Sequence, residues 1–320
     1  KDVLTIEIEH VNSEALHQLQ REGVKVHPNP TALDTIKDKG LQKQFYARHD
    51  LPTAPFALYE DEAAVRVALA EGKLRFPFVQ KSRTAGYDGR GVAVIDSEES
   101  LDKLLPGACM IEEKVDIDKE LAVIVARNEN GEIVSYPTVE MVFNPVANLV
   151  EFLQCPAHIP GELEEEAEAL ARRTIEAYDL CGLLAVELFL DKKGRLLINE
   201  VAPRPHNSGH HTIDSCYTSQ FEQHLRAILN LPLGSTRMKT ASVMVNLLGE
   251  PGHTGPAWYE GLSDCLAVEG VKVHLYGKSV TKPFRKMGHV TVIDANAEGA
   301  MEKAKRVKER LKVKVKRQKA

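Results

Sequence analysis

The chain has 320 residues, 43% of them hydrophobic, so it can bury a large core and is expected to form two or three domains. No apolar run approaches the roughly 20 residues that span a bilayer, and the N-terminal residues show no signal-peptide pattern. The five cysteines form no CxxC pair, which indicates a reducing compartment and argues against structural zinc. Residues 301–320 hold ten Lys or Arg and two Glu, a net +8, so the remainder has a net charge of −13, which argues against a nucleic-acid partner. We therefore expect a cytoplasmic, soluble protein without membrane contact.

Alternating apolar and polar side chains over residues 3–11 predict a strand with Glu7 and Glu9 on one side. A helix, an edge strand and a second helix are expected over residues 12–22, 24–27 and 31–51. Because a strand needs neighbours on a sheet, we expect that the start of this N-terminal domain is missing from the chain. Pro52 and Pro55 indicate a domain boundary.

A glycine-rich segment follows a helix over 61–71 and a strand over 76–80, and precedes a strand over 92–95. Gly86, Gly89 and Gly91 would let backbone N–H groups approach an anion, and Lys81 supplies a compact positive charge. The spacing matches neither a Walker A loop nor a Rossmann fingerprint. The pattern indicates a phosphate site, with a hairpin loop that binds nothing as the alternative.

An antiparallel meander is expected over residues 110–140, followed by an amphipathic helix that begins after Pro160. A hairpin then joins apolar runs over 183–190 and 195–201 through a four-residue polar turn. If Leu190 lies opposite Arg195, Glu187 lies diagonal to Glu200 and the two carboxylates share a face. Such a pair suits Mg²⁺, which accepts one or two protein carboxylates together with phosphate oxygens and water. The alternative is a solvated hairpin face.

The most polar segment follows this hairpin, over residues 202–211 (APRPHNSGHH). His206, His210 and His211 could be zinc ligands, because two His at positions i and i+4 of a helix form a ligand pair. Pro203, Pro205 and Gly209 argue against a helix in this segment. We therefore favour a rigid loop that holds a small anion. Cys216 could be a nucleophile, although a buried structural thiol is the favoured interpretation.

The last third of the chain, with strands over 242–247, 271–275 and 289–294, is expected to form a small β-rich domain. Lys278, Arg285 and Lys286 lie at strand ends and form either a second phosphate site or an exposed basic turn. The basic residues 301–320 are expected to be a solvated helix or linker, with a polyanion-binding arm as the alternative.

Four motifs together resemble N5-carboxyaminoimidazole ribonucleotide synthetases: GYDGRG at 86–91, INEVAPRPHNSGHHT at 198–212, TSQFEQHLRAIL at 218–229 and LYGK at 275–278. The resemblance implies an α/β (α+β) ATP-grasp fold with the remnant of an N-terminal domain over 1–54. The ATP-grasp domain would occupy 55–235, in subdomains 55–113 and 114–235, before a C-terminal β-rich domain over 236–300 and the basic tail 301–320. TIEIEHV at 5–11 is similar to the synthetase part of the fungal bifunctional enzyme, in which a carboxylase domain follows.

The resemblance also implies roles for individual residues. ATP would lie on the main chain of Glu112, Glu113, Lys114 and Val115, with its ribose on Glu120 and its phosphates on Lys39, Lys81, Asn199, Glu200 and the loop of Gly86, Tyr87, Asp88, Gly89, Arg90 and Gly91. Mg²⁺ would bind Glu187 and Glu200, and Arg204, His206, Asn207 and Asp88 would be catalytic, acting on bicarbonate and carboxyphosphate. The substrate 5-aminoimidazole ribonucleotide would contact Glu7, Tyr87, Asp88 and Ser208, with its phosphate on Lys278 and Arg285. The family's members are commonly dimeric.

The chain departs from the family's pattern at two further places. Phe143 stands where members usually have a His, and simple alternation turns Asn199 away from the Glu pair unless the strand is bulged. Three alternatives remain at this point: an ATP-grasp carboxylase with another acceptor, as in biotin carboxylase, a non-catalytic ATP-binding module, and a metal-dependent hydrolase that uses the histidines.

Overall fold

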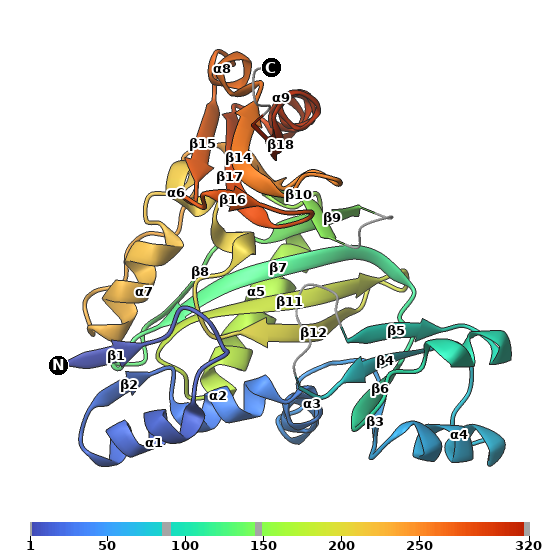
Figure 1. The fold of residues 1–320 in the computed structure, drawn as a ribbon. Coiled ribbons are helices and arrows are strands. Elements are labelled where there is room, and N and C mark those ends of the chain that lie inside the picture. Colours follow the sequence, from blue (N-terminus) through green and yellow to red (C-terminus); the bar gives the residue numbers. More distant parts are fainter. Residues whose placement is uncertain (1, 85–90, 145–148, 317–320) are drawn as a thin grey trace.

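The computed structural model describes residues 2–84, 91–144 and 149–316, and its mixture of helices and sheets agrees with the expected fold class (Figure 1). Among the described residues the strands form a two-stranded, a four-stranded, a nine-stranded and a three-stranded sheet. No helix within these ranges is long and apolar enough to cross a bilayer.

The N-terminal elements are β1 (Val3–Thr5), α1 (Ser13–Arg21), β2 (Lys25–His27), α2 (Pro30–Lys37) and α3 (Lys39–Arg48). β1 pairs in parallel with the equally short β2, so the strand expected over 3–11 is wrong beyond Thr5 and Glu7 and Glu9 follow it in a loop. The second expected helix is divided at Asp38, whose backbone is extended and whose side chain accepts hydrogen bonds from the N–H groups of Gly40 and Leu41. Asp38 therefore caps α3.

The four-stranded sheet has the order β3–β6–β4–β5, and all its pairs are antiparallel. Its elements are β3 (Phe56–Tyr59), α4 (Glu62–Ala70), β4 (Phe78–Ser82), β5 (Val92–Ile95), the 3-10 helix η1 (Glu98–Lys103) and β6 (Cys109–Glu113). Phe78, Ile95 and Ile111 pack on Val65 of α4, and burying each such side chain contributes about 1.5–3 kcal/mol. β4 and β5 pair on either side of the glycine-rich segment, as expected.

The large antiparallel sheet has the order β12–β11–β7–β9–β10–β13–β17–β15, with β8 beside β7. Its first part contains β7 (Ile117–Arg127), β8 (Ile133–Ser135), β9 (Val139–Asn144), β10 (Leu149–Cys155), α5 (Gly161–Ala177), β11 (Gly182–Asp191) and β12 (Leu196–Ala202). The strand expected over 133–140 is thus two strands. α5 buries Leu170 and Ile175 against Val123 of β7 and Val186 of β11, which fixes the central hairpin on a rigid support.

The short helices η2 (Asn207–Gly209) and α6 (Thr212–Ser215) and the helix α7 (Gln220–Ile228) follow the hairpin. The C-terminal elements are β13 (Ala241–Leu248), β14 (Gly255–Glu260), α8 (Leu262–Leu266), β15 (Val271–Leu275), β16 (Val280–Thr281), β17 (Lys286–Asp294), α9 (Ala297–Arg310) and β18 (Lys312–Val315). Because β13 pairs with β10, the C-terminal strands continue the large sheet.

The basic C-terminal segment packs into this last unit, with Ala304 and Val307 of α9 and Val313 of β18 buried in its core. β18 also pairs with β14. Lys308 pairs with Glu151. The helix expected in this region is therefore built into the C-terminal fold rather than extending from it.

Candidate active site

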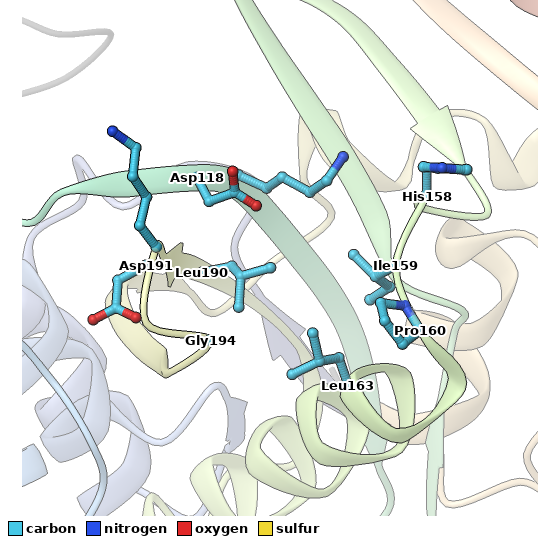
Figure 2. A pocket seen from close by; sticks show the side chains of 10 residues that line it. Asp118, His158, Ile159, Pro160, Leu163, Leu190, Asp191 and Gly194 are labelled. Atoms are coloured by element: carbon cyan, nitrogen blue, oxygen red, sulfur yellow. The ribbon is translucent and has the colours of Figure 1, made fainter.

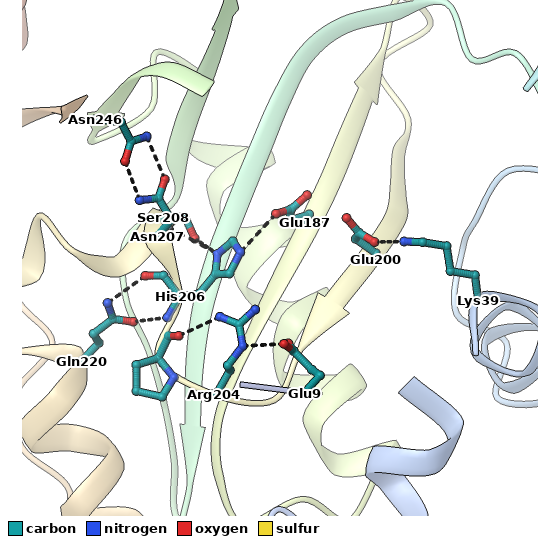
Figure 3. A network of polar contacts seen from close by, with 11 residues as sticks. Glu9, Lys39, Glu187, Glu200, Arg204, His206, Asn207, Ser208, Gln220 and Asn246 are labelled. Atoms are coloured by element: carbon teal, nitrogen blue, oxygen red, sulfur yellow. Dashed lines mark hydrogen bonds and ion pairs between the residues drawn. The ribbon is translucent and has the colours of Figure 1, made fainter. Parts of the chain in front are cut away.

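Glu187 and Glu200 face each other directly across β11 and β12, which Figure 3 shows from close by. The expected register is wrong by one residue, since Leu190 pairs with Leu196 rather than with Arg195. A bulge at Asn199 then shifts the pairing, so that Leu188 lies opposite Ile198 and Glu187 opposite Glu200. The expected shared face is present, and the bulge produces it.

The two carboxyl groups influence each other's ionisation. Burial, together with the charges of Glu200 and Glu120, raises the pKa of Glu187. Burial by itself would raise the pKa of Glu200 as well. The ion pair between Glu200 and Lys39 of α3 outweighs the effect of burial, so the pKa of Glu200 is lowered. Lys39 therefore already places a cation on the carboxylate pair, which indicates a site built to hold positive charge.

This donor set fits Mg²⁺, because two carboxylates on one face provide the protein ligands that this ion uses when phosphate and water complete its shell. Glu120 lies on the same face, since Ala122 of β7 pairs with Glu187 and Glu120 is two residues away. Burial raises the pKa of Glu120 to about 7. A third carboxyl group thus borders the pair, at the position expected for a ribose contact.

The bulge also turns Asn199 into the site. Lys81 of β4 donates a hydrogen bond to Asn199 Oδ1 at 2.8 Å and forms an ion pair with Glu112 of β6 at 2.6 Å. Lys81 and Asn199 belong to different sheets, so this contact closes the site between the two sheets. Asn199, which simple alternation directs elsewhere, lies with the residues expected to bind phosphate.

The segment expected to hold adenine joins the two sheets. β6 ends at Glu113, and Lys114 and Val115 connect it to β7. The Glu112 side chain is buried at 3% exposure between Lys81 and Lys43, while the Lys114 ammonium pairs with Asp96.

The expected phosphate loop is described only at its ends. Gly86, Tyr87, Asp88, Gly89 and Arg90 lie outside the described residues, as do the contacts expected of Tyr87 and Asp88. Gly91 has a φ of 74°, a conformation that favours glycine. On the other side, Arg83 is held by a bidentate contact with Asp38, at 3.0 and 2.7 Å.

The loop after β12 brings the expected anion-binding residues next to the carboxylate pair (Figure 3). His206 Nε2 lies 3.5 Å from Glu187 Oε1, and His206 Nδ1 lies 2.9 Å from the Ser208 hydroxyl. Arg204 Nε forms an ion pair with Glu9 at 2.7 Å. His206 is therefore held beside the Glu pair, with Arg204, Asn207 and Ser208 next to it on the same loop.

Two side chains that the sequence did not single out hold this loop. Gln220 accepts from the His206 N–H and donates to the His206 carbonyl, each at 2.8 Å. Asn246 of β13 exchanges two amide hydrogen bonds with Asn207, at 2.8 and 3.1 Å. Gln220 could have been found from the sequence, because it lies within the TSQFEQHLRAIL motif. No motif in the sequence pointed to Asn246, Glu9 or Lys43.

The alternative zinc interpretation is wrong for the part of the chain that the structure describes, which contains no group of three or more His, Cys, Asp or Glu side chains able to hold a metal. His206 faces Glu187, His210 stacks on His289, and His211 is buried beside the Ser208 carbonyl. Burial raises the pKa of Cys216 to about 11, so it is a structural thiol rather than a nucleophile.

The second expected phosphate site contains Lys278, Arg285 and Lys286, which lie between the end of β15 and the start of β17. Partial burial and the charges of Arg285 and Lys286 lower the pKa of Lys278, while Glu7 acts in the opposite direction. Lys278 donates a hydrogen bond to the Lys286 carbonyl at 2.8 Å, so these two residues are neighbours in the fold. The contact of Glu7 and Lys278 with one substrate stays a prediction.

An open pocket of about 460 Å³ lies elsewhere, between the hairpin turn and the start of α5 (Figure 2). It is lined by residues such as Asp118, His158, Leu163 and Asp191, and it includes none of the expected site residues. We assign it no function.

A charged site closed between two sheets, with paired carboxylates on the late hairpin, is the arrangement of an ATP-grasp protein, and the comparisons agree. The protein-family model described as "ATP-grasp domain" matches residues 44–221 of the chain. A second family model, described as "Phosphoribosylaminoimidazole carboxylase C-terminal domain", matches residues 242–303. The crystal structure of N5-carboxyaminoimidazole ribonucleotide synthetase from Thermotoga maritima has a TM-score of 0.90 and 46% identity, covering 99% of this chain and 83% of that one. The chain belongs to the ATP-grasp family and, within it, to the N5-carboxyaminoimidazole ribonucleotide synthetases.

Two further relatives are informative. The structure of N5-carboxyaminoimidazole synthase from Aspergillus clavatus, in complex with ADP and 5-aminoimidazole ribonucleotide, has a TM-score of 0.86 and 32% identity, covering 96% of this chain and 81% of that one. Phosphoribosylaminoimidazole carboxylase from Saccharomyces cerevisiae is 40% identical over 303 residues, which cover 91% of this chain and 52% of the relative. The chain thus spans about half the length of the curated fungal relatives it matches.

Proposed function

We propose that this protein uses ATP and bicarbonate to carboxylate the amine of 5-aminoimidazole ribonucleotide, producing N5-carboxyaminoimidazole ribonucleotide, ADP and phosphate in purine biosynthesis. The observation that supports this most is the direct pairing of Glu187 with Glu200 beside Lys81 and the Arg204–Ser208 loop. The similarity to a synthase with bound ADP and 5-aminoimidazole ribonucleotide supports the choice of acceptor.

In the proposed reaction, a bicarbonate oxygen attacks the γ-phosphorus and ADP leaves, giving carboxyphosphate. The ribonucleotide amine then forms a C–N bond with the carboxyl carbon as phosphate leaves and the amine loses a proton. Lys81 and Lys39 would hold the phosphates, Glu120 the ribose, and the main chain of 112–115 the adenine. Mg²⁺, held by Glu187 and Glu200, would neutralise the charge that develops on the phosphoryl group.

The chain's own residues explain how the anion would be held. Arg204 and His206 lie on a loop fixed by Gln220, with His206 Nε2 3.5 Å from Glu187. Bicarbonate bound there would lie next to phosphates bound above the Glu pair, and holding two reactants in place lowers the entropic part of the barrier. Glu7, Lys278 and Arg285 would bind the ribonucleotide and its phosphate, together with Tyr87 and Asp88.

The test is ADP release by wild type and Glu200→Gln, with and without bicarbonate and 5-aminoimidazole ribonucleotide. We expect release by the wild type to need both substrates, and the variant to lose at least about 100-fold in rate. Release that depends on bicarbonate but not on the ribonucleotide would reject the acceptor and favour a carboxylase of biotin carboxylase type.

We further propose a cytoplasmic homodimer, whose product is used by a carboxylase or mutase that is fused or separate. The support for a second copy is an exposed apolar stripe on α7 and its C-cap residue, where Phe221, Leu225 and Leu229 recur every four residues at 40, 53 and 50% exposure. Light scattering on wild type and Leu225→Glu tests it, with a monomeric wild type as the contrary result.

A further inference from the structure

A closed ring of polar contacts joins the two sheets through α3. The ammonium of Lys43 lies 2.5 Å from Glu112 Oε1, 2.5 Å from the Thr53 hydroxyl and 3.1 Å from the Ile198 carbonyl. Lys43 is 2% and Glu112 3% exposed. A lysine this deeply buried needs a specific compensation for its lost hydration, and the Glu112 carboxylate supplies it.

The ring closes on the other side of Glu112. Its second oxygen pairs with Lys81 at 2.6 Å, and Lys81 donates to Asn199 at 2.8 Å. Asn199 directly follows Ile198, whose carbonyl accepts a hydrogen bond from Lys43, so the contacts form a closed ring. Four elements, α3, β6, β4 and β12, therefore meet in one network.

Two consequences follow for the ATP-facing residues. Because Lys43 and Lys81 share one carboxylate, Glu112 cannot neutralise both charges fully. The bond from Lys43 to the Ile198 carbonyl, supported by the Thr53 hydroxyl at 2.7 Å, also fixes β12 immediately before its bulge. The bulge is what aims Asn199 and Glu200 at the site.

We propose that Lys43 is a positioning residue for the nucleotide: by pairing with one oxygen of Glu112 and holding β12 at Ile198, it prevents Glu112 from fully neutralising Lys81 and keeps the bulge in place. In this role Lys43 acts through Glu112 and Ile198, its partners in the fold, rather than on the substrate itself. The proposal rests on the proposed function only in taking Lys81 as a ligand of the ATP phosphates.

The test measures ADP affinity by calorimetry, together with KM for each substrate. We expect Lys43→Met to weaken ADP binding and raise the KM for ATP by about tenfold or more, because Glu112 then neutralises Lys81. The KM values for bicarbonate and for the ribonucleotide should change by less than about twofold. Lys37→Met is the matched control, since Lys37 contacts the Val11 carbonyl and Ser13 rather than a member of this ring and should leave ADP affinity unchanged.

The double variant Lys43→Met/Glu112→Gln separates positioning from simple structural damage. The double variant removes more contacts than Lys43→Met alone. However, it also removes the Glu112 carboxylate that would neutralise Lys81, so most of the ADP affinity should return. Wild-type affinity in Lys43→Met, or a double variant weaker than the single one, would overturn the proposal. If circular dichroism shows that Lys43→Met does not fold, the double variant decides, because it leaves no unpaired buried charge: it should keep most of the wild-type ADP affinity, and tenfold weaker binding would overturn the proposal.

These outcomes are distinct from those of the proposed function. A protein that binds ADP as described but releases none in response to the ribonucleotide would reject the acceptor and leave the role of Lys43 intact. A wild type that binds no ADP would reject both.

Discussion

Removing the carboxylate of Asp38 should loosen the first turn of α3, the helix that provides Lys39 and Lys43. Asp38 Oδ1 accepts hydrogen bonds from the N–H groups of Gly40 at 2.8 Å and Leu41 at 3.1 Å. The same carboxylate forms the bidentate contact with Arg83. Asp38→Ala removes both interactions, whereas Asp38→Asn keeps an oxygen that can cap the helix.

The magnitude follows from these contacts. Loss of an N-cap costs about 1 kcal/mol. The contact with Arg83 is charge-assisted, but the two side chains keep 27% and 18% of their exposure, so solvent reduces its contribution to about 1 kcal/mol. Asp38→Ala should therefore destabilise the turn by about 2 kcal/mol and Asp38→Asn by about 1 kcal/mol.

Amide hydrogen exchange at Gly40 and Leu41 measures this local opening directly. Exchange should accelerate about 30-fold in Asp38→Ala and about fivefold in Asp38→Asn. Asp61→Ala is the control, because Asp61 caps α4 by accepting from the Ala64 N–H and should leave exchange in α3 unchanged. Equal acceleration in the two Asp38 variants, or none in either, would refute the reasoning.

Three further predictions concern other parts of the molecule. A Cβ at Gly209 would lie 2.4 Å from Gln220 Oε1, so Gly209→Ala should displace the anion loop and slow ADP release about tenfold, whereas Gly161→Ala, with open space around it, should not. Burial and two neighbouring histidines lower the pKa of His289 to about 3, so below pH 6.5 the unfolded chain binds a proton that the folded chain does not. The free energy of unfolding should therefore fall as the pH falls, by up to about 1.4 kcal/mol per pH unit from this group. In His289→Phe, urea denaturation between pH 6.5 and 5 should show a shallower decline, and parallel curves would contradict the assignment. Lys278→Met should raise the KM for the ribonucleotide about tenfold and leave that for ATP unchanged; an equal rise in both would argue against a substrate phosphate there.

The local patterns were sufficient to predict the hairpin, the glycine-rich segment between β4 and β5 and the helix α5. They failed where a partner set the length of an element. The strand expected over 3–11 stops at Thr5 because β2 is only three residues long. The helix expected from Thr31 onward is divided because the Asp38 side chain caps a new start instead of continuing the first helix.

Local patterns were enough to place Glu187 and Glu200 on neighbouring strands of a hairpin, because the period of two and the polar turn are local properties of the chain. Local patterns did not predict the register of the two strands. Only the tertiary structure placed a bulge at Asn199, since Ile198 is held from outside the hairpin: its N–H donates to the Pro52 carbonyl, and its own carbonyl accepts from Thr53 and Lys43. Those contacts join residues about 150 positions apart, and no periodicity in either segment reports them, which is why the ring around Glu112 appears only once the chain is folded.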